Sequence, residues 1–470
     1  MSLLNKPEAQ VLLKDAELKA ATVRSCAERL MVYVQRYLPL FYRQEQRDAA
    51  VLVLRGKLSG LERKTSEPIA KLAKVAKRKI QDFVGEGCWD DEKVMKEMRV
   101  HVGAEIGDPK GILLVDGSGF AKKGTESCGV ARQWCGRLGK VENCQVGVFL
   151  GYASPKGHAP LDRQLYLPAE WTNDKARLDK CHVPEDVKFQ EKWRIALDLI
   201  ERSSPDVPHR WVGADDEFGR VTAFRGSLRL AKKRYVLDVP SNTLVRNIDE
   251  RRGDGGKPAF ETAHAWAARQ PKSAWRKIPI RDGEKGPLHV MALECRMQTK
   301  DEDGHVGTVE RLVVTKTVEA TPRLHYALSN AKNEPLKEVV RVGSERHRIE
   351  EVLQEGKGEV GLGHYEMRSW IGWHHHVTLT MLALWFLVME KRRIKKKTPA
   401  ITVQQVRQIF TNLLLPNPPT FAEIAAEISG TLLRNEEARI YHYYKATKRF
   451  PPRKVDVNSG RERKTKQQVQ

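Results

Sequence analysis

The sequence predicts an α/β fold: a mixed-sheet core, a helical N-terminal domain and a β-rich insertion. The apolar runs Ile112–Val115 and Arg210–Ala214 are too short for helices and rich in strand formers. Each is followed directly by an aspartate, Asp116 or Asp215. A carboxylate at the end of a buried strand needs a cation, a donor or solvent. Because open α/β sheets bind ligands at the carboxyl ends of their strands, a metal site is predicted at this edge.

The composition favours a protein that binds a polyanion. The 470 residues carry a formal charge of +22, which is typical of DNA-binding proteins, and a membrane surface is the weaker interpretation. The apolar run Val377–Met389 spans 13 residues, too few for a membrane helix, and predicts a core helix. The seven cysteines contain no CxxC pair, so neither a zinc knuckle nor a disulfide framework is indicated. With no signal peptide pattern at the start, a cytoplasmic, nucleoid-associated protein is expected.

Residues 1–105 are predicted to form the helical N-terminal domain. Its most basic part, Arg63–Val84, is predicted to be one helix with Ser66 as N-cap and Pro68 in the first turn. Five cations cover much of its polar face: Lys71, Lys74, Lys77, Arg78 and Lys79. A solvated helical surface and a DNA-binding surface both fit this pattern, and the sequence leaves the two interpretations open.

The predicted elements of residues 106–240 follow the order of a ribonuclease H-like catalytic core. Three strands joined by short links precede alternating helices and strands: Gly111–Val115, Gln145–Tyr152 and Gln164–Leu167. This order predicts a mixed sheet in which the first strand lies beside the fourth, Arg210–Ala214. Turn signals and alternating apolar runs predict the β-rich insertion over 241–335. The second part of the core follows over 336–397, and a C-terminal helical region with a basic tail over 398–470.

A third carboxylate is expected if the two aspartates hold two divalent ions, and the helix predicted over Arg346–Val360 provides the best candidate. At about 100° per residue, Glu350 and Lys357 fall within about 40° of Arg346 on the helix surface. Apolar residues fall on a neighbouring arc that can pack on the sheet. One edge of the buried face therefore carries a cation, an acid and a cation.

Arg346, Glu350 and Lys357 match the R(3)E(6)K spacing of the IS4-type DDE transposases, although Gly343 stands where that signature has a tyrosine. Over roughly residues 41–387 the chain resembles the IS701 family of these enzymes. Four blocks carry the resemblance: VDGSGF at 115–120, GVARQWCGRLGKVENCQVGV at 129–148, VGADDEFG at 212–219 and RIEEVLQEGKGEVGLGHYEMRSWIGWHHHVTLTMLA at 348–383.

This resemblance implies a DDE transposase whose catalytic, metal-binding triad is Asp116, Asp215 and Glu350. The triad would hold two Mg²⁺ or Mn²⁺ ions, because hard cations prefer carboxylates and offset their repulsion. Lys357 and Arg346 would bind phosphates beside the cut. The implied partners are double-stranded DNA, as terminal inverted repeats and target, and further copies of the chain that hold two ends together. A structure-specific nuclease of the same fold and a non-catalytic DNA-binding regulator are the alternatives.

Several other residues have two interpretations. Arg132 and Trp134 are either structural or in contact with DNA near the cut. By strand alternation alone Asp216 is nearly equal to Asp215. The histidines His374–His376 occupy consecutive helical positions that face different ways, which argues against a shared metal. The basic run KRRIKKK is predicted to lie on the surface and contact phosphates: Lys391, Arg392, Arg393, Lys395, Lys396 and Lys397.

Overall fold

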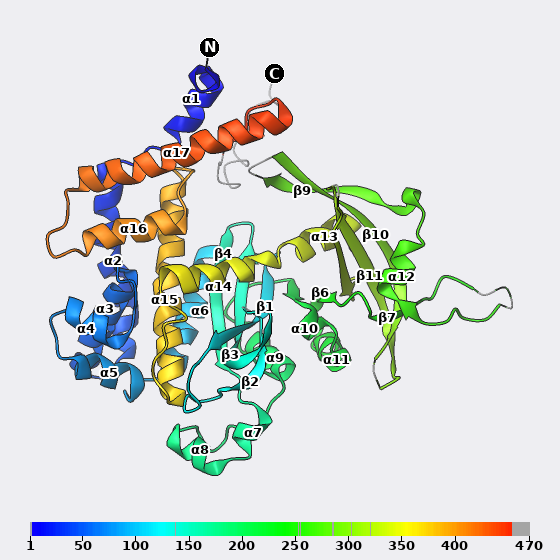
Figure 1. Ribbon diagram of the computed structural model, residues 1–470, viewed down its shortest axis with the longest axis horizontal. Coiled ribbons are helices and arrows are strands. Elements are labelled where there is room, and N and C mark those ends of the chain that lie inside the picture. Colours follow the sequence, from blue (N-terminus) through cyan, green and yellow to red (C-terminus); the bar gives the residue numbers. More distant parts are fainter. Residues whose placement is uncertain are drawn as a thin grey trace, which may run out of the picture.

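A computed structural model describes residues 2–136, 138–251, 253, 255–283, 286–301, 303–319 and 321–453. One mixed sheet of twelve strands runs through the molecule (Figure 1). The N- and C-terminal helices lie on one side of this view and the insertion on the other. The predicted fold class, a ribonuclease H-like mixed sheet with a β-rich insertion and N-terminal helices, is confirmed. The boundaries given for its five regions remain predictions, and most of the predicted basic tail lies outside the described residues.

Core and insertion contribute to the same sheet. The core strands are β1 (Ile112–Ala121), β2 (Ala131–Cys135), β3 (Lys140–Ser154), β4 (Gly157–Leu165), β5 (Trp211–Ala214) and β6 (Arg234–Val239). The later strands are β7 (Leu244–Asn247), β8 (Glu261–Thr262), β9 (Arg276–Gly283), β10 (Gly286–Lys300), β11 (Val306–Thr317) and β12 (Leu324–Ser329). Their order is β2-β3-β1-β5-β6-β12-β11-β10-β7-β8, with β4 on β3 and β9 on β10. The insertion thus extends the core sheet through the β6–β12 pair.

Strand β1 is longer than predicted. The sequence predicts an end at Val115, but β1 continues through Asp116 to Ala121 and pairs with β3 along its whole length. The predicted neighbour β5 is confirmed, and its parallel pairing with β1 stops at Val115. Glycine is required at position 119, because a Cβ there would stand 2.8 Å from Sγ of Cys135 in β2. Asp116 therefore lies inside a strand, at the point where the neighbouring strand ends.

Helices pack on the core strands and on one another. The N-terminal helices are α1 (Pro7–Lys14), α2 (Ala20–Tyr37), α3 (Gln44–Leu58), α4 (Ser66–Leu72), α5 (Lys77–Gly85) and α6 (Asp91–Ile106). The helices between the strands are α7 (Ala169–Thr172), α8 (Lys175–Lys180), α9 (Lys192–Ser203), α10 (Asp216–Gly219), α11 (Thr222–Leu230) and α12 (Ala263–Ala268). The last helices are α13 (Leu336–Ser344), α14 (His347–Glu359), α15 (Trp370–Lys395), α16 (Val403–Leu413) and α17 (Phe421–Thr447).

Helix α15 is buried between the N-terminal helices and the sheet. It packs on β4 and α14, and also on α3, α5 and α6. Nearly all its residues from Trp370 to Glu390 are buried, because apolar side chains surround the helix on every face. The core helix predicted from Val377–Met389 is confirmed. Among the described residues, no helix combines the length and apolarity that a bilayer crossing requires.

The prediction of one continuous basic helix over Arg63–Val84 is wrong. The segment forms α4 and α5, which are separated by a turn where Lys74 has a φ of 53°. The N-cap of α4 is Thr65, and Ser66 is the first helical residue. The five cations of this segment are exposed around the turn. They form a basic surface, although its shape differs from one continuous helical face.

Buried ion pairs join the core to the elements on either side. Asp162 of β4 is fully buried and accepts hydrogen bonds at 2.9 Å from Arg99 of α6 and Arg202 of α9. Toward the insertion, Arg225 of α11 pairs with Glu310 of β11 at 3.1 Å. Removing one partner of such a pair typically costs about 3–5 kcal/mol. The pairs therefore fix the helices around the sheet.

Candidate active site

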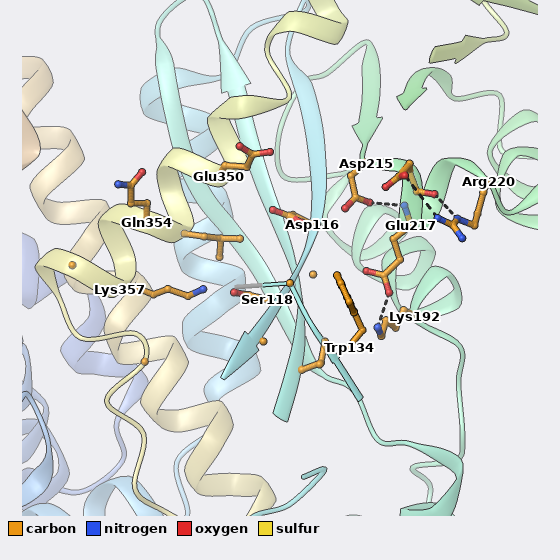
Figure 2. Close-up of a pocket in the computed structure, with 18 of the residues that line it drawn as sticks. Asp116, Ser118, Trp134, Lys192, Asp215, Glu217, Arg220, Glu350, Gln354 and Lys357 are labelled. Carbon is orange, nitrogen blue, oxygen red and sulfur yellow. Dashed lines mark hydrogen bonds and ion pairs between the residues drawn. The ribbon is translucent and has the colours of Figure 1, made fainter. Parts of the chain in front are cut away.

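A pocket of about 1130 Å³ lies where β1, β5 and α14 meet. Asp116 of β1, Asp215 after β5 and Glu350 of α14 all line it. Figure 2 shows Asp116 between Glu350 and Asp215. The structure thus brings together three predicted acids that are far apart in the sequence.

The parallel pairing of β1 and β5 places the two aspartates next to each other. The last paired residues are Val115 and Ala214, and Asp116 and Asp215 are the next residues of the two chains. Since β5 ends there, no further strand residue covers the edge of β1 beside Asp116. The sheet therefore opens at the position where both carboxylates lie.

Asp215 is held in place as a helix cap. Its Oδ1 accepts a hydrogen bond from the backbone N–H of Glu217 at 3.1 Å, at the start of α10. Asp216 lies in the first turn of α10, and its carboxylate is 3.7 Å from the guanidinium of Arg220. Both aspartates line the pocket, but the register with β1 makes Asp215 the neighbour of Asp116.

Glu350 is positioned by the close approach of α14 to the sheet. A Cβ at Gly151 of β3 would stand 2.6 Å from Cδ1 of Ile349, so glycine lets the helix come near. Ile349 is buried against the sheet, and Glu350 lies on the pocket wall. The next residue, Glu351, pairs with Arg348 at 2.8 Å. Of the two adjacent glutamates, the helix therefore presents Glu350 to the pocket.

Arg346 links two carboxylates. Its Nε lies 2.8 Å from Oδ2 of Asp238 in β6, and its Nη1 lies 2.5 Å from Oε1 of Glu350. Asp238 lies near the end of β6. Because Arg346 contacts both carboxylates, Asp238 helps to hold the arginine that supports Glu350. The predicted contact of Arg346 with phosphate remains a prediction.

The electrostatics of the pocket disfavour ionised carboxylates. Burial, together with the charges of Asp215 and Glu350, raises the pKa of Asp116 to about 8. Burial, together with the charges of its neighbours in α10, raises the pKa of Asp215 to about 6. Burial also raises the pKa of Asp238 to about 6, although Arg346 opposes the shift. A cation in the pocket would relieve this repulsion.

The carboxylate oxygens of the pocket are ligands of the type that hard divalent cations prefer. Among the described residues, a cluster of three possible ligands whose ligand atoms all lie within 4.8 Å of one another occurs at Asp301, Asp303 and His305. The ligand atoms of Asp116, Asp215 and Glu350 do not all lie within that distance of one another. Three carboxylates with solvent access nevertheless form the donor set that Mg²⁺ and Mn²⁺ prefer. These residues fit such ions.

Lys357 and Arg132 occupy different cavities. Lys357 lines the acid pocket, and its Nζ lies 5.4 Å from the ring centre of Phe120 in β1. Arg132 is exposed and lines a second cavity together with Glu126 and Trp171. The phosphate contact of Lys357 and the DNA contact of Arg132 remain predictions, and only Lys357 would make its contact beside the acids.

The basic run lies at the C-terminal end of α15. Three of its residues pair with acids of the same protein: Lys391 with Glu355 (3.8 Å), Arg392 with Glu105 (3.3 Å) and Arg393 with Glu390 (2.9 Å). Lys395 is half-buried, and Lys396 and Lys397 are exposed. The DNA contact predicted for the run remains a prediction, with the last two lysines best placed for it.

The three consecutive histidines pack in the core. Each has a ring nitrogen near a backbone carbonyl: His374 near Trp370, His375 near Val84 and Trp89, and His376 near Gly361 and Leu362. Burial lowers the pKa of His374 and of His375 to about 4. Their contacts are those of structural residues on a buried helix.

Sequence reasoning missed part of the pocket wall. Lys192 at the start of α9 pairs with Glu217 at 2.5 Å, and both line the pocket. The sequence carries no signal for Lys192, because it lies outside the four blocks. Trp134 also lines the pocket. It lies in the second block of the resemblance, but the sequence left open whether it is structural or contacts DNA.

Residues 36–287 match the family described as DDE superfamily endonuclease, and the chain belongs to this family. The match includes Asp116 and Asp215 and ends before Glu350. The chain is also similar to a protein of Microchaete diplosiphon named probable transposase for insertion sequence element IS701. The two are 26% identical over 324 residues, which cover 64% of this chain and 78% of that protein. The resemblance to IS701-family DDE transposases is confirmed.

Proposed function

We propose that this protein is a transposase that binds the terminal inverted repeats of its element, cleaves the DNA there and joins the ends to target DNA. The observation that carries the proposal is the shared pocket of Asp116, Asp215 and Glu350 in a member of the DDE endonuclease family. The similarity to an IS701 transposase supports joining as well as cleavage. The formal charge of +22 suits a DNA partner.

Asp116, Asp215 and Glu350 would hold two Mg²⁺ or Mn²⁺ ions. The raised pKa of Asp116 supports this, because burial and the charges of Asp215 and Glu350 make its ionised form costly unless a cation is bound. When bound, such ions supply Lewis-acid activation of the attacking oxygen and neutralise charge on the phosphate.

The surrounding residues would position acids and DNA. Arg346 orients Glu350 and screens Asp238 through its two ion pairs. Lys357, on the same helix, would bind an oxygen of the scissile phosphate as a point charge. Binding of two element ends at once would require at least a dimer on DNA.

The test uses purified full-length protein, Mg²⁺ and linear duplexes that carry the DNA flanking its gene. Wild type should cut at the element ends, and Asp116→Ala should bind these ends without cutting them. Asp301→Ala, an acid outside the pocket, serves as the matched control and should cut like wild type. Cutting by Asp116→Ala at the wild-type rate would overturn the assignment. Supplying pre-cleaved ends with a target plasmid then tests joining, and cutting without joining would identify a structure-specific nuclease.

A further inference from the structure

One large aromatic side chain on the pocket wall has no part in the proposed chemistry. Trp134 lies in β2, the edge strand of the sheet, and is 56% exposed. All ten tryptophans of the chain are described, and the other nine are buried or half-buried. An indole normally contributes its large apolar surface to a core or an interface. The single exposed tryptophan of this protein instead lines the pocket of the three acids.

Trp134 belongs to an apolar patch on the β2–β3 hairpin. Val141 is its cross-strand partner and is 52% exposed, and Leu138 at the hairpin turn is 44% exposed. These three residues are called the hairpin patch. The amide of Gln133 donates a hydrogen bond to the backbone oxygen of Cys144 at 3.0 Å, which fixes the two strands beneath the patch.

The neighbourhood of the hairpin patch suits a nucleic acid strand. Figure 2 shows the Trp134 ring between Ser118 of β1 and the Lys192–Glu217 pair. Arg132 and Lys140 on the same hairpin are exposed. Aromatic faces flanked by cations bind bases by stacking and phosphates by charge. Three apolar side chains offer far less area than the roughly 800 Å² per partner of a stable protein interface.

We propose that Trp134 stacks on an unpaired nucleobase of the DNA strand whose backbone enters the acid pocket. The inference rests on the proposed function. The base would be one next to the scissile phosphate, because Trp134 and the three acids line the same pocket. Taking this base out of the duplex stack would hold the strand in register with the acids, so Trp134 binds and positions the substrate.

The test combines variants of the protein with damaged DNA. Short duplexes carry the element ends, and one base at a time near the cut is replaced by an abasic site. Loss of one base–aromatic stack predicts that Trp134→Ala cleaves intact DNA about 5- to 100-fold more slowly. One abasic position should slow wild type by a similar factor and leave Trp134→Ala unchanged. Trp134→Phe, which can still stack, should retain most of the rate.

Two further measurements separate stacking from structural effects. The matched control is Tyr441→Ala, which removes an aromatic side chain that is 61% exposed on α17, and it should behave as wild type. With Ca²⁺ in place of Mg²⁺, 2-aminopurine at the identified position should lose fluorescence on binding wild type and keep it on binding Trp134→Ala. Binding is thereby read without cutting.

Equal sensitivity of wild type and Trp134→Ala to every abasic site would overturn the inference. Weakened self-association of Trp134→Ala in sedimentation, without coupling to any base, would assign the hairpin patch to a contact between copies and would also overturn it. The same assay includes Asp116→Ala, so failure at Trp134 alone leaves the proposed function intact. Absence of cutting by wild type would overturn both.

Discussion

Two groups of possible metal ligands in this molecule, each with two aspartates, differ in how the fold brings them together. Asp301, Asp303 and His305 lie within one turn between β10 and β11, and their ligand atoms are mutually within 4.8 Å. Asp116, Asp215 and Glu350 come from three separate elements and stand farther apart. The first group is mostly exposed, and the backbone N–H of His305 donates to Asp301 at 2.7 Å. By distance alone, the turn would be the better metal site.

The difference shows that the electrostatic cost of burying carboxylates indicates a functional site better than short distances between ligand atoms do. Acids of an exposed turn remain hydrated, so the repulsion between them costs little stability. In the pocket, burial and mutual repulsion raise the pKa of Asp116 to about 8. Bringing such carboxylates together destabilises the fold. Acids with strongly shifted pKa values in a pocket therefore indicate a functional site. The following predictions test this contrast.

The largest effect is expected from Glu350→Gln. Removing a carboxylate that we propose to bind the metal should lower the rate of end cleavage by about three orders of magnitude or more. Glu351→Gln is the matched control, because Glu351 is adjacent on α14 and pairs with Arg348. Its cleavage rate should stay within a few-fold of wild type. Equal losses of cleavage rate in the two variants would show that both substitutions act by disturbing α14, and would contradict a specific role for Glu350.

Asp116→Asn should stabilise the metal-free protein. Because folding raises the pKa of Asp116 to about 8, the stability contributed by its protonated form is lost as the pH rises from about 4 toward 8. Asparagine has no charge to bury, so the free energy of unfolding at pH 8 should increase by about 1–3 kcal/mol, and by less at pH 5. Denaturant titrations at both pH values measure this difference.

Divalent ions should stabilise wild type but not Asp116→Asn. Saturating Mg²⁺ should raise the melting temperature of wild type by about 2–5 °C through binding to the folded state, and leave Asp116→Asn unchanged. Equal shifts in both proteins would place the ion elsewhere.

Arg346→Gln should destabilise the protein in a pH-dependent manner. Arg346 lowers the pKa values of Asp116, Asp215 and Asp238, so its removal raises them further. The free energy of unfolding should fall by about 1–3 kcal/mol at pH 8 and by less at pH 5, where Asp215 and Asp238 take up protons. Arg348→Gln is the matched control. It removes pairs outside the pocket and should cost at most about 1 kcal/mol at either pH.

The smallest effect is expected at the exposed turn. Asp301→Asn combined with Asp303→Asn should change the free energy of unfolding by no more than about 0.5 kcal/mol, because solvated surface acids contribute little. The stabilisation by Mg²⁺ should be the same as in wild type. Loss of that stabilisation would reverse the contrast between the two groups.

The three acids could be predicted because each obeys a local rule. A short apolar run that ends in a carboxylate identified Asp116 and Asp215, and helical spacing placed Glu350 on an edge of its helix. The strand order of the core was also predictable, because connection lengths restrict the topology. The assignment of Asp215 over Asp216 came from the family resemblance, and the register with β1 supports it.

The remaining features depend on contacts distant in sequence. The glycines after Asp116 look like a turn, and only pairing with β3 makes them a strand. The break at Lys74 has no glycine or proline to mark it, since a lysine there adopts positive φ. The pair Arg346–Asp238 joins two segments across the insertion. No local pattern contains these partners.

The central claim is that the three pocket acids hold divalent ions together, and anomalous diffraction from crystals soaked in Mn²⁺ tests it most directly. The account predicts two anomalous peaks within the pocket, coordinated by Asp116, Asp215 and Glu350. Peaks at the Asp301–His305 turn, with none in the pocket and Glu350 still paired with Arg346, would contradict it.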